Sequence, residues 1–256
     1  DAFFKKVCHF ELPEVREYAV GMLFLPKSQN QVDFCIKTFE KCVQDQNLQI
    51  LGWRDVPVDV SNLGQVAAEK EPTIKQVFVG KNGLKITEQE FNAKLFAARK
   101  ISEHAIRNSK TSESHRYYFT SLSTTTIIYK GLLMPEDISR YYTDLTDTDL
   151  VTRLALVHQR FSTNTFPSWD LAQPFRYMCH NGEINTLQGN LNWIKTNEKG
   201  YTSPYFSKEE MEMLLPIVSD NQSDSASLDN MIELLTLTGR SLPHVMMMLI
   251  PEAWDG

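Results

Sequence analysis

The sequence lacks most of the features that mark membrane, secreted, zinc-binding or nucleic-acid-binding proteins. Its apolar runs, such as residues 20–25 and 245–250, are far shorter than the roughly 20 apolar residues of a membrane-spanning helix. Four cysteines in 256 residues form no CxxC pair, which argues against structural zinc and a disulfide framework. The net charge of −6 excludes a global basic field for nucleic acid.

No signal-like pattern opens the chain, since Asp1 leads directly into a mixed polar and apolar stretch. A hydrophobic content of 42% with 23% charged residues is typical of a globular protein that buries a real core. We find no internal repeat and no low-complexity linker. The sequence therefore predicts a single domain over residues 1–256, with no metal site and no membrane or nucleic-acid partner.

Strand-like patterns recur through the first 150 residues. Residues 18–25 form an apolar run stopped by Pro26, as expected of a buried strand. Residues 48–59 and 74–80 are further strand candidates. The stretch 115–131 is rich in β-branched and aromatic residues with a polar break, which predicts two strands joined by a turn.

Two long helices are predicted between these strands. After an N-cap at Ser28, apolar residues recur at helical spacing, which places Cys35 and Cys42 on a buried stripe as packing residues. Thr87 and Glu90 form a capping box that opens the second helix. These signals indicate alternating helices and strands in this half.

The second half of the chain changes character. Residues 153–175 are predicted to form a strand that leads into a long, aromatic, proline-containing loop. Residues 176–194 are predicted to form another strand, a turn at Asn181-Gly182 and a helix. Residues 219–249 indicate a polar Ser/Asp loop followed by two helices.

Three polar turns in this half carry residues suited to binding or catalysis. Arg160 follows an apolar stretch, and its guanidinium could bind a carboxylate through two hydrogen bonds or simply lie at the surface. Asn181 and Gly182 offer two donors of the kind that stabilise a tetrahedral acyl-transfer intermediate, although Asn-Gly is also the commonest type I′ turn. Asp224 could hold a substrate ammonium or, like its two serine neighbours, cap the following helix.

Cys179 and His180 invite a different interpretation, as a thiol–imidazole pair. Neighbouring side chains of a strand point to opposite faces, so these two are not expected to form a nucleophile and its base. A cysteine hydrolase built on Cys179 with His158 is an open alternative.

The order and the amino-acid sequences of four motifs in this half resemble the class II glutamine amidotransferase region of the glutamate synthase large-subunit family. The resemblance runs nearly continuously from about residue 154 to residue 254 and is carried by HQRFSTNTFPSW (158–169), HNGEINTLQGN (180–190), SDSASLDN (223–230) and GRSLPHVMMMLIPEAW (239–254). It implies an α+β fold, the four-layer αββα sandwich of the N-terminal-nucleophile hydrolases, with two mostly antiparallel sheets between helical layers.

The resemblance also implies that the three polar turns form one glutamine site. Arg160 would bind the α-carboxylate of L-glutamine, with Thr163 nearby, and Asp224 would bind the α-amino group. Asn181 and Gly182 would form the oxyanion hole. Cys179 and His180 would then serve as scaffold.

One element of the family pattern, the N-terminal cysteine whose thiolate attacks the amide, does not open this chain, which begins with Asp1. We therefore expect the domain to be incomplete at both ends and inactive by itself. A non-catalytic glutamine-binding module is the alternative. The loop over residues 164–175 is similar to the family's glutamine loop, which closes over substrate. Asp170 and Gln188 stand where the family often has proline and arginine.

The implied partners lie outside this region. The remaining domains of a glutamate synthase would use the released ammonia to form glutamate from 2-oxoglutarate, with FMN and an iron–sulfur cluster there and no cofactor here. An electron-donating subunit or ferredoxin would supply the electrons. We expect the cytoplasm as the location, or a plastid in a plant or alga.

Overall fold

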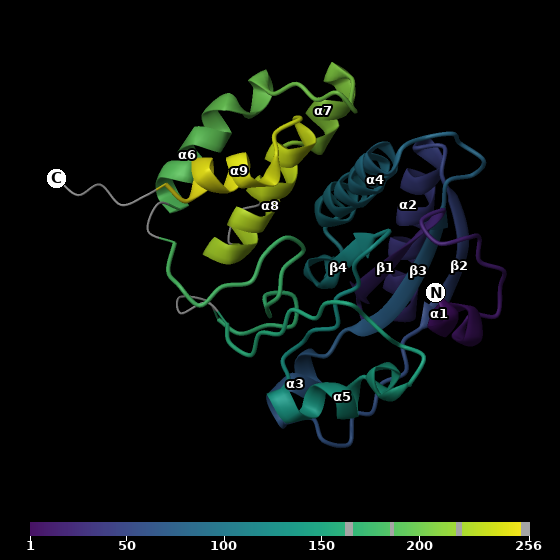
Figure 1. Cartoon of the computed structure of the whole chain (residues 1–256). Coiled ribbons are helices and arrows are strands. Elements are labelled where there is room, and N and C mark those ends of the chain that lie inside the picture. Colours follow the sequence, from purple (N-terminus) through teal and green to yellow (C-terminus); the bar gives the residue numbers. More distant parts are fainter. Residues whose placement is uncertain (162–165, 185–186, 219–221, 252–256) are drawn as a thin grey trace. The chain divides into compact units, whose positions relative to one another are not determined.

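The computed structural model describes residues 1–161, 166–184, 187–218 and 222–251. The chain divides into two compact units (Figure 1). The N-terminal unit comprises Asp1–Gln159 and Ser168–Ala172, and the C-terminal unit comprises Arg160–Pro167 and Gln173–Gly256. Each unit is described by itself below.

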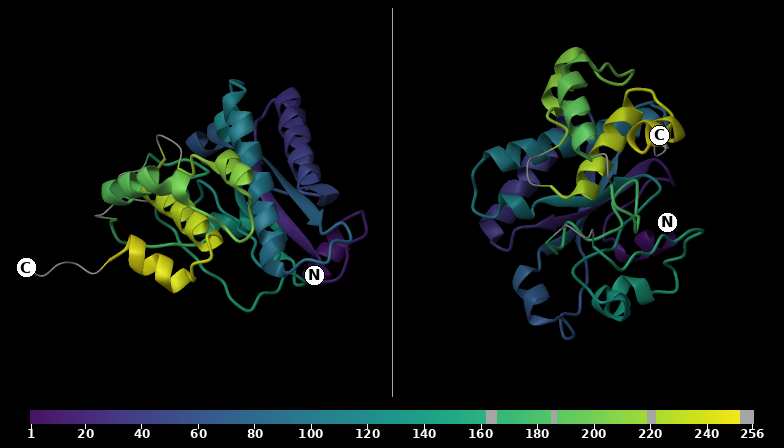
Figure 2. Two further views of the ribbon diagram at one scale, coloured as in Figure 1. Left: turned by 90° about the horizontal axis from the view of Figure 1, so that it is seen from above. Right: turned by 90° about the vertical axis from the view of Figure 1, so that its left-hand side faces the viewer.

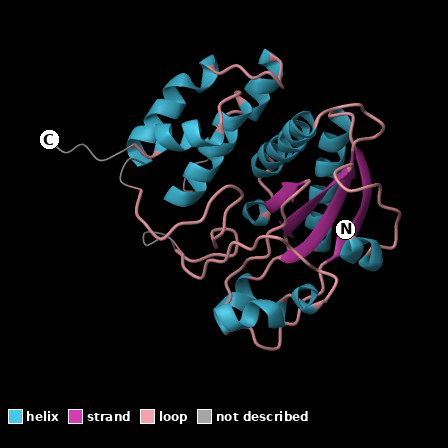
Figure 3. Ribbon diagram, in the orientation of Figure 1, coloured by secondary structure: helices cyan, strands magenta, loops and turns pink. Residues whose placement is uncertain are grey.

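The N-terminal unit is built on an antiparallel four-stranded sheet (Figure 3). Its strands, in the spatial order β2-β3-β1-β4, are β1 (Tyr18–Leu25), β2 (Gln49–Asp55), β3 (Thr73–Gly80) and β4 (Tyr118–Ser123). The strands predicted over 18–25, 48–59 and 74–80 are confirmed. All eight residues of β1 are buried, which explains why its sequence is a continuous apolar run and not an alternating one.

Both faces of this sheet are covered. On one face, α2 (Gln29–Asp45) and α4 (Glu88–Asn108) pack side by side (Figure 2) and enclose a core with Leu23, Val77 and Phe119. A second cluster, containing Phe24 and Ile74, lies against the segment between β2 and β3 and the residues that follow β4. The unit's remaining helices are short: α1 (Ala2–Val7), α3 (Gln65–Lys70), α5 (Ile138–Tyr141), η1 (Ser114–Arg116), η2 (Pro135–Asp137) and η3 (Thr143–Thr146).

The two long helices follow their sequence signals. Ser28 is the N-cap residue of α2, and Cys35 and Cys42 are buried on the core side of that helix. Thr87 and Glu90 form the capping box of α4, in which the Thr87 hydroxyl accepts from the Glu90 N–H and the Glu90 carboxylate accepts from the Thr87 N–H. Both helix predictions are confirmed.

Only one of the two strands predicted within 115–131 forms. After β4 the chain turns, but the Ile128 backbone bonds to side chains: its N–H donates to Ser121 Oγ at 3.1 Å and its carbonyl accepts from Thr120 Oγ1 at 2.8 Å. Hydroxyl groups thus take the backbone groups that a ladder would use. The prediction of a second strand is wrong for this reason.

The strand predicted at the start of 153–175 does not form either. Residues 151–160 have no assigned secondary structure apart from a bend, and the side chains of Val151, Leu154, Leu156 and Val157 are 64–83% exposed. An apolar sequence becomes a strand only where a neighbouring strand takes its N–H and carbonyl groups, and no described strand pairs with this segment. The apolar sequence alone is therefore insufficient evidence for a strand at residues 153–157.

A closed polar cluster lies within the N-terminal unit. The Arg54 guanidinium donates to both carboxylate oxygens of Asp144, at 2.7 and 2.6 Å, and to Gln76 Oε1 at 2.8 Å. The Tyr129 hydroxyl donates to the same carboxylate at 2.9 Å and accepts from Gln76 Nε2 at 3.1 Å. Burial, followed by the Asp144 charge, raises the pKa of Tyr129 above its usual value and keeps it a donor.

The C-terminal unit consists of helices and loops in its described part. Its helices are α6 (Leu187–Asn197), η4 (Glu198–Gly200), α7 (Lys208–Leu214), α8 (Asp224–Leu237) and α9 (Leu242–Leu249). Gly239, between α8 and α9, has a φ of +89°, a conformation that suits glycine. The chain as a whole is α+β with an antiparallel sheet, as predicted, and the helices predicted after Asn181-Gly182 and within 219–249 are confirmed.

Candidate active site

The loop that leads to Asn181 is held by side-chain hydrogen bonds. The buried Gln173 amide accepts from the His180 N–H at 2.8 Å and donates to the His180 carbonyl at 3.1 Å. Both backbone groups of His180 are therefore satisfied by one side chain, as a neighbouring strand would satisfy them. Residues 176–180 are not a strand, so that prediction is wrong, and Gln173 supplies the physical reason.

Asn181 and Gly182 form an exposed bend directly after this loop. Neither has the positive φ that a type I′ turn requires at both central positions, so the hairpin interpretation is wrong. A Cβ added to Gly182 would meet no atom within 4 Å. Neither strain nor packing in the described structure therefore requires glycine at this position, and a ligand could approach the Gly182 N–H closely.

Asp224 is the first residue of α8 and is only half-buried. The N-cap is Ser223, whose hydroxyl accepts from the Ala226 N–H at 3.1 Å. The Asp224 Oδ1 atom accepts from the Ser225 N–H at 2.7 Å and lies 3.3 Å from the Ser225 hydroxyl. Within the described part of the chain we find no hydrogen bond to Asp224 Oδ2. The capping role thus belongs to Ser223, which leaves an oxygen of Asp224 available to a ligand.

A hydrogen bond brings these two turns together. His180 Nε2 lies 2.7 Å from Ser225 Oγ. His180 directly precedes Asn181, and Ser225 directly follows Asp224. The structure therefore places the Asn181-Gly182 bend beside the start of α8.

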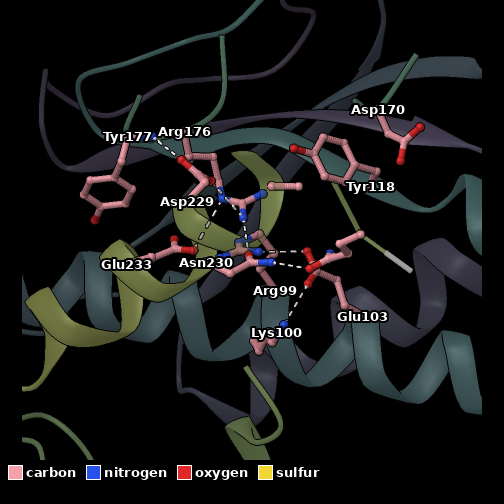
Figure 4. A network of polar contacts seen from close by, with 12 residues as sticks. Arg99, Lys100, Glu103, Tyr118, Asp170, Arg176, Tyr177, Asp229, Asn230 and Glu233 are labelled. Carbon is pink, nitrogen blue, oxygen red and sulfur yellow. Dashed lines mark hydrogen bonds and ion pairs between the residues drawn. The ribbon is translucent and has the colours of Figure 1, made fainter. Parts of the chain in front are cut away.

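A second set of contacts strengthens this junction. The Arg176 guanidinium donates to Asn230 Oδ1 at 2.7 Å and lies 3.2 Å from the Asp229 carboxylate and 3.4 Å from the Glu233 carboxylate (Figure 4). The Tyr177 N–H also donates to Asp229 at 2.8 Å. Figure 4 shows these α8 side chains pointing toward Arg176.

The sequence analysis did not single out this Arg176 network. A usable signal was present, because Asp229 and Glu233 stand four residues apart among the apolar residues Leu228, Met231 and Ile232. Two acidic residues at that spacing share a helix face and need a buried cation. Arg176 supplies it.

Of the two residues predicted to bind the α-carboxylate, the structure describes Arg160 but not Thr163. Arg160 is exposed and lies at the end of residues 151–160, which form no strand, so it does not follow a strand as predicted. Thr163 lies outside the described residues. Of the predicted site residues, the structure brings Asn181, Gly182 and Asp224 together, and it shows no direct bond from Arg160 to any of these three.

The loop predicted to close over substrate, residues 164–175, is anchored in its middle. Trp169 is buried, and its indole N–H donates to the Ala67 carbonyl at 3.1 Å. The buried Lys130 ammonium donates to the carbonyls of Asp170 and Ala172, at 2.8 Å each. Residues 168–172 therefore belong to the N-terminal unit, and residues 164–165 of the predicted loop lie outside the described residues.

The four cysteines offer no alternative centre in the described structure. All four are free thiols. Burial raises the pKa of Cys35 to about 12 and that of Cys42 to about 11, so both remain protonated near neutral pH. Cys179 is half-buried, and we find no hydrogen bond from its sulfur to His158 or His180.

Among residues 1–161, 166–184, 187–218 and 222–251, no three His, Cys, Asp or Glu side chains gather closely enough to hold a metal ion. The helices of this described part are each too short or too polar to cross a bilayer.

The family to which the chain belongs follows from comparison of its sequence with known protein families. The family described as "Glutamine amidotransferases class-II" matches residues 1–256. The chain is a class II glutamine amidotransferase by family. Its helices and antiparallel sheet are consistent with the α+β fold predicted for this family.

The relatives of this amidotransferase chain are large proteins. It is 44% identical to the glutamate synthase [NADPH] large chain of Bacillus subtilis over 99% of its own length and 16% of that protein. It is 44% identical to the glutamate synthase [NADH] of Saccharomyces cerevisiae, over 98% of this chain and 12% of that protein. The chain is 42% identical to the ferredoxin-dependent, chloroplastic glutamate synthase of rice, over 92% of this chain and 14% of that protein. The chain thus spans about a sixth or less of these relatives.

Asp170 and Gln188, the two positions predicted to differ from the family pattern, both have partners in this structure. Asp170 accepts from the Ser168 hydroxyl at 2.6 Å within the anchored part of the loop. Gln188 is exposed on α6 and donates to Asn192 Oδ1 at 3.0 Å, one helical turn away. Neither belongs to the group formed by Asn181, Gly182 and Asp224, so neither replaces one of those three residues.

Proposed function

We propose that this chain is the glutamine amidotransferase part of a glutamate synthase and releases ammonia from L-glutamine for glutamate formation from 2-oxoglutarate. Family membership and the relatives' identity over nearly the whole chain support this proposal. The observation that carries the site itself is Gly182: it is exposed, has no positive φ, and has open space where a Cβ would be.

Each proposed residue has a distinct role toward glutamine. Arg160 binds the α-carboxylate through its planar pair of N–H donors, with Thr163 contributing nearby. Asp224 binds the α-ammonium with its available carboxylate oxygen. Opposite charges at the two ends match the zwitterion and orient the side-chain amide toward Asn181.

Asn181 and Gly182 act on the reacting carbonyl. The Asn181 side-chain amide and the Gly182 N–H donate to the oxygen that becomes negative as the tetrahedral intermediate forms. The attacking thiolate is that of the N-terminal cysteine expected for the family, with its own α-amine as the base. The sulfur–carbon bond forms as the carbonyl oxygen becomes negative, and the carbon–nitrogen bond then breaks as ammonia leaves with the proton that the α-amine took from the thiol. Water hydrolyses the resulting thioester, which releases glutamate and restores the thiol.

The rest of the proposed protein supplies the redox chemistry. We place FMN and the iron–sulfur cluster in other domains of the protein. The relatives' names include NADPH, NADH and ferredoxin, so an electron-donating subunit or ferredoxin is the proposed partner. We propose the four-layer αββα sandwich of the N-terminal-nucleophile hydrolases as the fold of this domain, and the cytoplasm or a plastid as its location.

The function is tested by comparing two glycines in the full-length protein. An added Cβ meets open space at Gly182 and at Gly189, which lies in α6, so Ala should fold at both positions. We expect Gly182→Ala to lower kcat for ammonia release from glutamine by about tenfold or more, because the methyl group crowds the oxyanion. Gly189→Ala should leave kcat unchanged.

Two results would count against the proposal. Equal activity of the two glycine variants would remove the oxyanion role of Gly182. Tight glutamine binding with no ammonia release by the full-length protein would support the non-catalytic glutamine-binding module instead.

A further inference from the structure

The hydrogen bond between His180 and Ser225 has a particular place in the sequence. Each partner is the direct neighbour of a proposed site residue, His180 of Asn181 and Ser225 of Asp224. The 2.7 Å contact between His180 Nε2 and Ser225 Oγ therefore spans from the oxyanion turn to the residue proposed to bind the ammonium group.

Both ends of this contact are fixed. The His180 N–H and carbonyl are bonded to the Gln173 side chain, so the backbone that carries the imidazole is held. Ser225 is fully buried in the first turn of α8, a helix whose N-terminus is capped by Ser223. Because both groups are anchored, the short hydrogen bond between them fixes the distance between the loop that carries His180 and the first turn of α8.

The contact also reaches the Asp224 carboxylate. Ser225 Oγ lies 3.3 Å from Asp224 Oδ1, and the Ser225 N–H donates to the same oxygen at 2.7 Å. The three groups form a chain from imidazole to hydroxyl to carboxylate. One serine therefore positions the carboxylate and binds the loop that ends in Asn181.

We propose that His180 is a positioning residue that fixes the spacing between the Asn181-Gly182 donors and the Asp224 carboxylate through Ser225. The proposal rests on the function proposed above. Spacing matters because glutamine must engage Asp224 at one end and the oxyanion donors at the other. A misplacement of about 1 Å can lower a rate on the order of 100-fold.

The test exchanges His180 for two amides of different reach, in the full-length protein. Gln places its terminal nitrogen near the position of the imidazole Nε2 and can keep the bond to Ser225, whereas Asn is one methylene shorter and cannot. We expect His180→Asn to lower kcat for glutamine hydrolysis by about tenfold or more, with KM changed by less than about threefold, since the oxyanion forms only in the transition state. His180→Gln should keep kcat within about threefold of the parent.

Two further variants complete the design. His244→Asn changes an exposed histidine on α9 and should leave both constants unchanged. Ser225→Ala should lower kcat as His180→Asn does, and the double variant should be no worse than the worse single variant, because both remove the same interaction.

The outcomes separate the two proposals. Equal kcat values for His180→Asn and His180→Gln, or additive losses in the double variant, would overturn the positioning role. If Gly182→Ala is impaired in the same assays, the proposed function stands and only the role of His180 falls. Thermal unfolding is measured for each variant, and if His180→Asn does not fold, a normal kcat in Ser225→Ala overturns the proposal.

Discussion

The two units use buried charge in different ways. In the N-terminal unit, Arg54, Asp144, Tyr129 and Gln76 bond to one another and form a closed cluster. In the C-terminal unit, the contacts among His180, Ser225, Arg176 and α8 end next to the exposed residues Asn181 and Gly182 and the half-buried Asp224.

This difference separates a polar cluster that stabilises the fold from a polar network that belongs to a candidate binding site, and it depends on contacts alone. A polar cluster whose members satisfy one another stabilises a fold, since each buried donor and acceptor has a partner. A network that positions exposed donors and a carboxylate leaves these groups able to bind a ligand. The predictions below separate a loss of stability in the first cluster from a loss of catalysis in the second.

The largest effect is expected for Asp144→Ala in the closed cluster. Removal of the carboxylate leaves the Arg54 guanidinium, only 11% exposed, without its ion-pair partner, which should destabilise the N-terminal unit by about 3–5 kcal/mol. Hydrogen exchange of the β1 and β3 amides in the full-length protein measures this. Asp55→Ala, which breaks an exposed pair with Lys75, is the matched control and should cost about 0–1 kcal/mol. Similar exchange in both variants would show that the cluster does not stabilise the sheet.

A smaller effect, on binding and not on folding, is expected for Arg160→Lys. Lysine keeps the charge but loses the paired N–H donors, so KM for glutamine should rise about tenfold or more, equivalent to ~1.4 kcal/mol. Arg153→Lys, at another exposed arginine of the same segment, should leave KM unchanged. A normal KM in both variants would reduce Arg160 to a surface residue.

The smallest effect is expected for Cys179→Ala. The half-buried thiol contributes packing alone, so the change should cost about 1–2 kcal/mol or less and leave kcat within about twofold. Steady-state ammonia release and thermal unfolding measure both quantities. Loss of all activity in a folded variant would favour the internal-cysteine hydrolase instead.

Local signals predicted the strands and the two long helices within residues 18–108 of the N-terminal unit. The continuous apolar run of β1, the helical spacing of Cys35 and Cys42 and the Thr87–Glu90 capping box each act within a few residues of the structure they specify. Such signals are readable in a single sequence because the physical cause lies close by.

The failures share a different cause. The apolar residues 154–157 and the stretch 176–180 have strand-like sequences, yet a strand also needs a partner, and that information is not local. The side chains of Gln173 and Thr120 take backbone groups that a ladder would otherwise use. The sequence motifs named Asn181, Gly182 and Asp224, but the bond between His180 and Ser225 joins residues 45 positions apart and could be found only in the structure.

The most direct test of the account is labelling of the full-length protein with a glutamine analogue that carries an electrophilic diazoketone in place of the amide. We expect mass spectrometry to find the label on an N-terminal cysteine, excess glutamine to prevent labelling, and Asp224→Asn to slow it. Label on Cys179, or labelling at an unchanged rate in Asp224→Asn, would contradict the assignment of Asn181, Gly182 and Asp224 to one glutamine site.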